Sequence, residues 1–348
     1  MTHKILVIQT AFIGDVILIT PLLKGIKEIY PNSEIDVVVH SKCWNVLHNN
    51  PYVNKIWNLE KRNLLVFIRF IFKIRRVKYD ISVSPHSSFR SGLISLLGGI
   101  KCRIGFKRNL QQYLLTKSII HDKTGHKVYK NLRLLELLPN CSGVAPSPKT
   151  CLYPIEKNYK KVEKLMAGVN PATTKSVLIA PGSVWFTKRW PLEKYALLTE
   201  KLISKGYNIF LSGSAGEKSI NEYILHRTLN KYPDKSNHII CTAGKFDLLD
   251  TAALIEKVDL VICNDSGTLH IANAMQTTVF AFFGPTVKSI GYFPLGEKDY
   301  VFEVDLPCRP CGKHGGKKCP KKHFNCMEMI TVDDVFEKVC EYLKAPDS

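Results

Sequence analysis

Three polar stretches in the second half of the chain combine residue types that suit a phosphorylated sugar. They are APGSVWFTKRWP (180–191), SGSAGEK (212–218) and CNDSGTLHIANAM (263–275), and each continues an apolar run typical of a buried strand. Their hydroxyl, ammonium, carboxylate and imidazole groups belong to Ser183, Thr187, Lys188, Glu217, Asp265, Ser266, Thr268 and His270. Backbone N–H groups at the start of a helix favour anions. The pattern predicts a diphosphate site, with Asp265 or Glu217 accepting a sugar hydroxyl.

Each stretch also has a structural interpretation. Asp265 or Ser266 is a common type of helix N-cap. Glu217 suits a first helical turn, because the helix dipole favours acidic groups there. The stretch 180–191 also fits a polar connection between a strand and a helix. A cap still leaves amides of the first turn available, so the two interpretations are compatible for 263–275.

An isolated carboxylate interrupts the apolar stretch TAFIGDVILITPLL (10–23). Asp15 follows Gly14 and is surrounded in sequence by isoleucine, leucine and valine. An unpaired carboxylate is costly in apolar surroundings. We place Asp15 in a loop between a strand at 4–10 and a helix at about 16–29, where ligands of parallel sheets bind. There it can stay hydrated and reach a ligand.

Alternating apolar runs and helical segments predict two doubly wound α/β domains. Strands are expected at 4–10, 35–39 and 80–84, and then at 176–181, 208–213, 238–244, 259–265 and 278–285. Helices of the second series start near Pro191, Glu217, Leu248 and Gly267. A Pro-rich passage at 138–154 approaches the boundary. We expect domains of residues 1–165 and 166–348.

Positive charge is concentrated in the first half. Of the net charge of +19, residues 1–165 carry +17 and residues 166–348 carry +2. The first half is therefore expected to meet nucleic acid, an anionic membrane surface or an acidic acceptor. In the segment 62–78, Arg69, Lys73 and Arg76 recur at helical spacing. This helix either lies on an anionic membrane or presents a solvated basic stripe.

Cysteine usage and hydropathy indicate a cytoplasmic protein. We expect no membrane-spanning helix and no signal peptide, and eleven cysteines without a signal peptide favour a reducing compartment. Cys308, Cys311, Cys319 and Cys326 form the spacing CxxC-x7-C-x6-C. A structural zinc site usually pairs two close CxxC units. Free thiols in a loop are therefore favoured over structural zinc.

The chain resembles the bacterial lipopolysaccharide heptosyltransferases, glycosyltransferase family 9, and is heptosyltransferase II-like. The matching pieces are IGDVILITPLL, RIGF (103–106), APGSVWFTKRWP, SGSAGE, NDSGTLHIA and FGPT, in family order over nearly the whole chain. NDSGTLHIA together with the GDV opening is specific to the family. The resemblance implies the GT-B fold, two Rossmann-like domains facing a central cleft.

The family's activity is the inverting transfer of a heptose from ADP-heptose to the lipopolysaccharide inner core. The resemblance implies that Asp15 is the catalytic base and that Lys188, with Thr187 beside it, contacts the donor phosphate. It further implies that the nucleotide-heptose is bound by Asp265, Ser266, Gly267, Thr268 and His270. Ser183 and Glu217 are placed on the donor side as well. Lys188 and helix amides can stabilise the departing diphosphate, so no metal is expected.

The family's acceptor is a phosphorylated lipid anchored in the inner membrane. The resemblance therefore implies peripheral contact with the cytosolic face of that membrane, with Arg69, Lys73 and Arg76 on the membrane side. Arg90 and Arg103 are expected near the acceptor, because guanidinium groups suit phosphates. No nucleic acid is expected, since no basic groove motif with interleaved aromatics is evident. The alternatives are a membrane- or nucleic-acid-binding protein without catalysis, or a family member that uses another nucleotide sugar.

Overall fold

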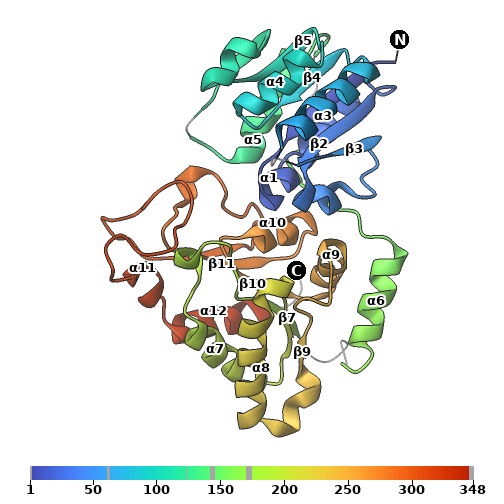
Figure 1. The fold of residues 1–348 in the computed structure, drawn as a ribbon. Coiled ribbons are helices and arrows are strands. Elements are labelled where there is room, and N and C mark those ends of the chain that lie inside the picture. Colours follow the sequence, from blue (N-terminus) through green and yellow to red (C-terminus); the bar gives the residue numbers. More distant parts are fainter. Residues whose placement is uncertain (1, 61–62, 123, 142–145, 170–174, 345–348) are drawn as a thin grey trace. The chain divides into compact units, whose positions relative to one another are not determined.

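The chain divides into two compact units, Met1–Tyr153 and Pro154–Ser348. The structure, a computed structural model (Figure 1), describes residues 2–60, 63–122, 124–141, 146–169 and 175–344. The boundary falls before helix α6 (Glu156–Met166), which we expected in the first domain. This helix packs on α9 (Leu248–Lys257), where the Asn158 amide donates to the Asp250 carboxylate at 2.8 Å. The expected boundary at 165 is therefore corrected. Residues 142–145 of the Pro-rich passage lie outside the described residues.

Unit 1 contains a six-stranded parallel sheet in the order β3-β2-β1-β4-β5-β6. Its strands are β1 (Lys4–Gln9), β2 (Glu34–His40), β3 (Lys55–Leu59), β4 (Ile81–Ser84), β5 (Cys102–Lys107) and β6 (Lys117–Ile120). The predictions at 4–10, 35–39 and 80–84 are confirmed. Strands β3, β5 and β6 were not predicted. The central strand β1 contributes four fully buried residues, Ile5 to Ile8, to the core.

The helices of unit 1 cross between these strands. They are α1 (Ile13–Ile17), α2 (Thr20–Ile29), α3 (Leu64–Val77), α4 (Phe89–Leu97) and α5 (Lys127–Leu132), with 3-10 turns at Ser41–Leu47, Leu110–Leu114 and Arg133–Leu137. The single helix expected at 16–29 is two helices. Pro21 lies in the first turn of α2, where the N–H that proline lacks has no partner in the helix. Proline could not continue α1, because the interior of a helix requires that N–H. Asp15 therefore lies in the first turn of α1 and not in the preceding loop.

Unit 2 repeats the architecture with a sheet in the order β12-β11-β10-β7-β8-β9, also parallel throughout. Its strands are β7 (Ser176–Ala180), β8 (Asn208–Leu211), β9 (Ile239–Cys241), β10 (Leu260–Asn264), β11 (Val279–Phe283) and β12 (Tyr300–Glu303). The five predicted strands are confirmed, and β12 is an addition. The α/β fold class is thus confirmed in both units.

The other helices of unit 2 include the four that were predicted. They are α7 (Leu192–Ser204), α8 (Lys218–Lys231), α9, α10 (Gly267–Ala274), α11 (Asn325–Glu328) and α12 (Val332–Lys344), with 3-10 turns at Phe186–Lys188, Ala215–Glu217, Pro233–His238 and Lys288–Ile290. Trp190 is buried in the core and stacks on Phe282 at 4.4 Å between ring centroids. Burial of this ring anchors the end of the stretch 180–191. No helix in the described ranges is long and apolar enough to cross a bilayer.

Candidate active site

A buried asparagine fixes the loop 180–191. The Asn264 side chain, at the end of β10, donates to the carbonyls of Pro181 and Gly182 at 2.9 and 3.2 Å. Its oxygen accepts from the Trp190 N–H at 2.9 Å and the Tyr195 hydroxyl at 3.0 Å. All polar groups of the amide are thereby used, as a fully buried amide requires. Asn264 holds both ends of this loop, a role that the sequence did not indicate.

Lys188 and Asp265 form an ion pair in unit 2. The Lys188 ammonium lies 2.6 Å from Asp265 Oδ2, and only 13% and 8% of the two side chains are exposed. The Thr286 hydroxyl donates to the same carboxylate oxygen at 2.6 Å. Two predicted donor stretches, 180–191 and 263–275, therefore meet the FGPT motif at this carboxylate. Asp265 holds the ammonium in place, and an arriving anion would compete with it.

The N-terminus of α10 has no side-chain cap. Ser266 is at the N-cap position in an extended conformation, and its hydroxyl makes no capping hydrogen bond. The interpretation of Asp265 or Ser266 as a cap is therefore not realised in this structure. Four N–H groups at a helix start lack partners inside the helix. Those at Gly267 and Thr268 lie one turn from the Lys188–Asp265 pair. His270 is buried in the same helix, 6.2 Å from the Tyr292 ring.

Glu217 packs against the loop 180–191. Its Oε2 accepts from the Ser214 N–H and hydroxyl, both at 2.8 Å, so it forms the capping box expected of an acidic first-turn residue. Its Oε1 faces Gly182, where an added Cβ would lie 1.9 Å away. Only glycine at 182 leaves room for this carboxylate. Glu217 thus has a structural role, because it completes the capping box. It also lies beside the loop 180–191, on the donor side, where we expect it to bind a sugar hydroxyl.

Ser183 and Thr187 serve the loop itself. Ser183 is buried, and its carbonyl accepts from Arg189 Nε at 2.9 Å. Thr187 exchanges two hydrogen bonds with Gly316, its hydroxyl accepting at 2.7 Å and its N–H donating at 3.1 Å. A Cβ at Gly315 would lie 2.6 Å from Trp185 and 2.9 Å from Lys188. The Cys-rich segment therefore packs directly on the loop that carries Lys188.

Arg309, between the first two cysteines of that segment, organises the FGPT loop. Its guanidinium donates to the carbonyls of Phe283 at 3.0 Å, Gly284 at 2.5 Å and Thr286 at 2.9 Å, and to that of Val304. It also pairs with Glu303 at 3.0 Å, with 5% of its side chain exposed. Bonds to three carbonyls of one loop position Thr286 beside Asp265. The sequence did not indicate this role.

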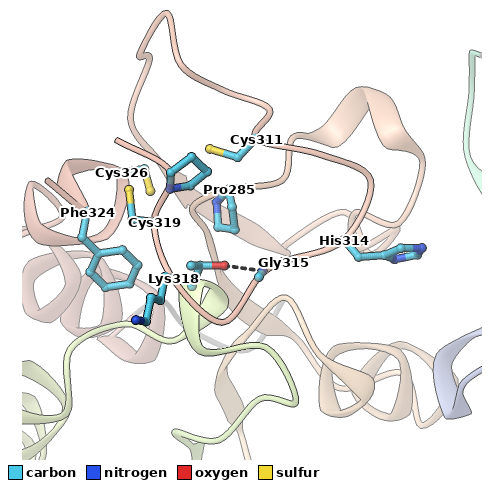
Figure 2. A pocket seen from close by; sticks show the side chains of 11 residues that line it. Pro285, Cys311, His314, Gly315, Lys318, Cys319, Phe324 and Cys326 are labelled. Carbon is cyan, nitrogen blue, oxygen red and sulfur yellow. Dashed lines mark hydrogen bonds between the residues drawn. The ribbon is translucent and has the colours of Figure 1, made fainter. Parts of the chain in front are cut away.

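Three of the four clustered cysteines line one pocket. Figure 2 shows Cys311, Cys319 and Cys326 around this pocket, with the His314 ring pointing away from them. All four cysteines are unpaired thiols, and burial, helped by Cys311, raises the pKa of Cys326 to about 11. Among the residues that the structure describes, no group of three His, Cys, Asp or Glu is arranged to hold a metal.

In unit 1, polar groups surround Asp15 at the carboxyl ends of the strands. The Gln9 amide donates to the Asp15 carbonyl at 3.4 Å, and the Thr10 hydroxyl lies 3.0 Å from His86 Nδ1. Burial lowers the pKa of Lys127 to about 8, and the Asp15 carboxylate opposes that shift. The sequence analysis missed His86 and Lys127. His86 lies two residues after the end of β4 and Lys127 begins α5, and these positions were the available signal.

Further cations lie near Lys127. Burial lowers the pKa of His121 to about 4, with added repulsion from Lys127 and Arg108, and burial also lowers the pKa of Lys130. These groups come from β5, β6 and α5, where the chain leaves the sheet. With a pKa of about 4, His121 is neutral near pH 7. The positive charges of Lys127, Lys130 and Arg108 mark a place where an anion is electrostatically favoured.

The two arginines expected near the acceptor differ. Arg90, in the first turn of α4, is exposed and lies 5.7 Å from the Phe67 ring. Arg103 donates instead to the backbone carbonyls of Ile100 at 2.8 Å and Leu114 at 2.6 Å. It stands near the start of β5, so it lies at the edge of the parallel sheet opposite to Asp15. This geometry gives Arg103 a structural position, unlike the expectation.

These features define a two-unit α/β protein with a buried ion pair beside the start of a helix. The profile of glycosyltransferase family 9 (heptosyltransferase) matches residues 67–323. Lipooligosaccharide heptosyltransferase 2 of Haemophilus ducreyi is 30% identical over 82% of this chain and 84% of that protein. The chain therefore belongs to glycosyltransferase family 9 and is a glycosyltransferase.

Similarity extends over the full length. Lipooligosaccharide heptosyltransferase 2 of Haemophilus influenzae is 28% identical over 98% of this chain and 99% of its own. The solved structure of Escherichia coli ADP-heptose lipopolysaccharide heptosyltransferase II superposes with a TM-score of 0.77 at 26% identity, covering 98% of each chain. A family 9 glycosyltransferase from Veillonella parvula, at 21% identity, shares the fold with a TM-score of 0.83 over 98% and 97% of the two chains. The expected GT-B fold class is confirmed.

Proposed function

We propose that this protein transfers a heptose from ADP-heptose to a lipopolysaccharide inner-core acceptor, with inversion at the anomeric carbon. The names of the relatives support the donor and the acceptor. The observation that carries the proposal is the buried Lys188–Asp265 pair at the uncapped start of α10. A cation, free helix amides and a carboxylate are together suited to a sugar diphosphate.

Lys188 and the first amides of α10 stabilise the leaving group. As the bond from the anomeric carbon to the diphosphate oxygen breaks, its electron pair stays on the diphosphate. The added negative charge is met by the Lys188 ammonium and by the N–H groups of Gly267 and Thr268, without a metal. When phosphate approaches Lys188, Asp265 becomes available to a ribose or heptose hydroxyl. Ser183, Thr187 and His270 complete the donor side, and Glu217 keeps the neighbouring loop in place.

Asp15 takes the proton from the acceptor. The acceptor hydroxyl attacks the face of the anomeric carbon opposite the diphosphate, and its proton passes to the Asp15 carboxylate. Lys127 supplies a positive charge that interacts with this carboxylate. The sugar configuration inverts because attack and departure occur on opposite faces.

The acceptor phosphates are expected near the cations of unit 1. Lys127, Lys130 and Arg108 lie at the carboxyl ends of its strands, and Arg90 begins α4 at the same edge. A phosphorylated acceptor matches the positive charge of this unit. The enzyme then works in the cytoplasm, where ADP-heptose is available, at the cytosolic face of the inner membrane.

Titration with a panel of nucleotide sugars tests the donor. ADP-heptose should bind more tightly than UDP-glucose, GDP-mannose or ADP-glucose, and transfer to a heptose-deficient core should continue in EDTA. The control variant in these titrations is Lys218→Ala, which removes an exposed lysine of α8. Tighter binding of another sugar nucleotide would show that this nucleotide, and not ADP-heptose, is the donor. Activity that is lost in EDTA and restored by Mg2+ would contradict the metal-free mechanism. Binding of nucleic acid without any sugar transfer would contradict the assignment as a glycosyltransferase.

A further inference from the structure

Helix α3 exposes a stripe of large apolar side chains to solvent. Phe70, Ile71 and Ile74 face the sheet and are buried. On the opposite side Leu64, Leu65, Ile68 and Phe72 are 72, 65, 41 and 61% exposed. Only single exposed apolar residues are ordinary at a surface, whereas a contiguous group marks an interaction site. The sequence analysis expected either a membrane-lying helix or a solvated basic stripe here, and it did not indicate which apolar side chains are exposed.

The apolar stripe is bordered by cations. Arg69, Lys73 and Arg76 are exposed and, at 100° per residue, lie beside Leu65 and Phe72 on the outer face. No acidic residue occurs between Leu64 and Val77. Unit 1 as a whole has 23 Lys and Arg against 8 Asp and Glu, a net charge of +15. The helix thus offers apolar area and positive charge together, as helices that lie in a lipid interface do.

The stripe also begins at the edge of unit 1 that carries Asp15. Helices of a parallel sheet begin at the carboxyl ends of its strands, so the start of α3 and the start of α4 share that edge with Asp15. Figure 1 shows α3 and α4 next to each other in unit 1, and Arg90 of α4 lies 5.7 Å from Phe67 of α3. Phe89, 48% exposed, begins α4 and extends the apolar surface there.

We propose that the outer face of α3 docks on an anionic lipid bilayer, with Leu64, Leu65, Ile68 and Phe72 inserted between headgroups and Arg69, Lys73 and Arg76 at the level of lipid phosphates. The proposal rests on the proposed function, since it brings the edge that carries Asp15 to the surface where a lipid-anchored acceptor is held. Charge complementarity selects an anionic bilayer over a protein partner. Two components of binding follow, one sensitive to salt and one not.

Vesicle cosedimentation separates the two components. The probes are vesicles of phosphatidylcholine alone and with 30% phosphatidylglycerol, each at low and high salt. Reversal of Arg69, Lys73 and Arg76 to Glu should lower the partition coefficient on anionic vesicles about a hundredfold or more at low salt. Exchange of Leu65, Ile68 and Phe72 for Ser should lower it about tenfold or more at both salt concentrations. These six side chains are exposed, so the variants should fold.

Matched variants on unit 2 are the controls. They are the reversal of Lys157, Lys164 and Lys205 to Glu, which are also exposed, and Met329→Ser, which removes an apolar side chain that is 52% exposed. Neither should change vesicle binding more than a few-fold.

Transfer to a delipidated, soluble acceptor distinguishes this proposal from the proposed function. It should remain near the parent rate in the α3 variants, and loss of vesicle binding with that rate retained supports the proposal. Vesicle binding that ignores both triple variants overturns it. A Ser variant that changes a dimer into a monomer and leaves vesicle binding intact also overturns it, and assigns this face to a second copy of the chain. If the parent transfers no sugar but still binds through α3, the proposed function fails while the docking face stands.

Discussion

The two units share one sheet topology and use its carboxyl edge differently. In unit 2 the polar groups at this edge are bonded to one another across elements, as Asn264, Asp265 and Arg309 show. In unit 1 the same edge gathers the cations Lys127, Lys130 and Arg108 together with Asp15, and burial lowers the pKa values of Lys127 and His121. The difference fits the donor site that we propose in unit 2 and the acceptor side that we propose in unit 1. Each prediction below acts on one side of that contrast.

Asp15→Asn should produce the largest effect. The amide keeps the shape of the side chain and cannot take a proton, so turnover should fall by roughly a hundredfold or more. ADP-heptose affinity, measured by calorimetry, should stay within a few-fold of the parent because the donor loops belong to unit 2. Asp122→Asn, at an exposed turn of unit 1, is the control. Turnover close to the parent value would remove Asp15 from the role of base.

Lys188→Ala should weaken donor binding and slow transfer together. The ammonium meets the diphosphate in the ground state and more strongly as it departs, so we expect about a tenfold higher Kd and about a hundredfold slower single turnover. The buried Asp265 also loses its partner, so thermal unfolding must be followed in parallel. Unchanged donor affinity and an unchanged rate of transfer in a folded variant would show that the loop 180–191 only connects a strand to a helix.

Arg309→Lys should destabilise the FGPT loop of unit 2. An ammonium cannot reach the carbonyls that the planar guanidinium contacts, and buried carbonyls left unpaired cost about 1–3 kcal/mol each, so unfolding should be easier by about 3 kcal/mol. Donor affinity should fall severalfold because Thr286 moves away from Asp265. Arg227→Lys is the control, since the partners of Arg227 are the carboxylates of Glu193 and Glu200 and not the carbonyls of a loop. Equal effects of the two changes would show that Arg309 has no special role in the loop.

Lys127→Met should change stability in a pH-dependent way. The pKa of Lys127 is about 8 in the folded protein and near 10.5 in an unfolded chain, so the unfolded state binds more protons between these values. Folding of the parent therefore gains stability as the pH rises from 8 to 10.5. The Met variant should exceed the parent most below pH 8, and the advantage should disappear above pH 10.5. Denaturant titrations at several pH values measure this, and a constant difference would contradict the burial of the charge.

The sequence predicted the fully buried strands and missed three of the four edge strands, β3, β6 and β12. Strands β7, β10 and β11 are buried at every position, so they read as uninterrupted apolar runs. Strands β6 and β12 lie at the edges with three and two of their four residues exposed, and their composition resembles that of loops. The RIGF motif was recognised, but its place at the start of β5 was not, and so Arg103 was put at the wrong edge.

Site residues were predictable where a loop opens a helix, and their partners were not. Lys188 and Asp265 are 77 positions apart, and nothing local shows that they pair. Arg309 stands in a Cys-rich segment that suggested metal chemistry, whereas its contacts depend on backbone carbonyls that carry no sequence signal. The exposed apolar face of α3 was missed because periodicity does not tell which of two apolar faces is covered.

The contact between Thr187 and Gly316 sets an order for assembly on the ribosome. The two residues are separated by 129 positions, yet two hydrogen bonds and the tight fit of Gly315 define the loop that carries Lys188. A nascent chain that has released the whole of β7 and α7 still lacks this support. The donor loop can therefore reach its final form only after the segment near residue 316 has left the exit tunnel. A chain stalled earlier should expose Lys188 to solvent and protease.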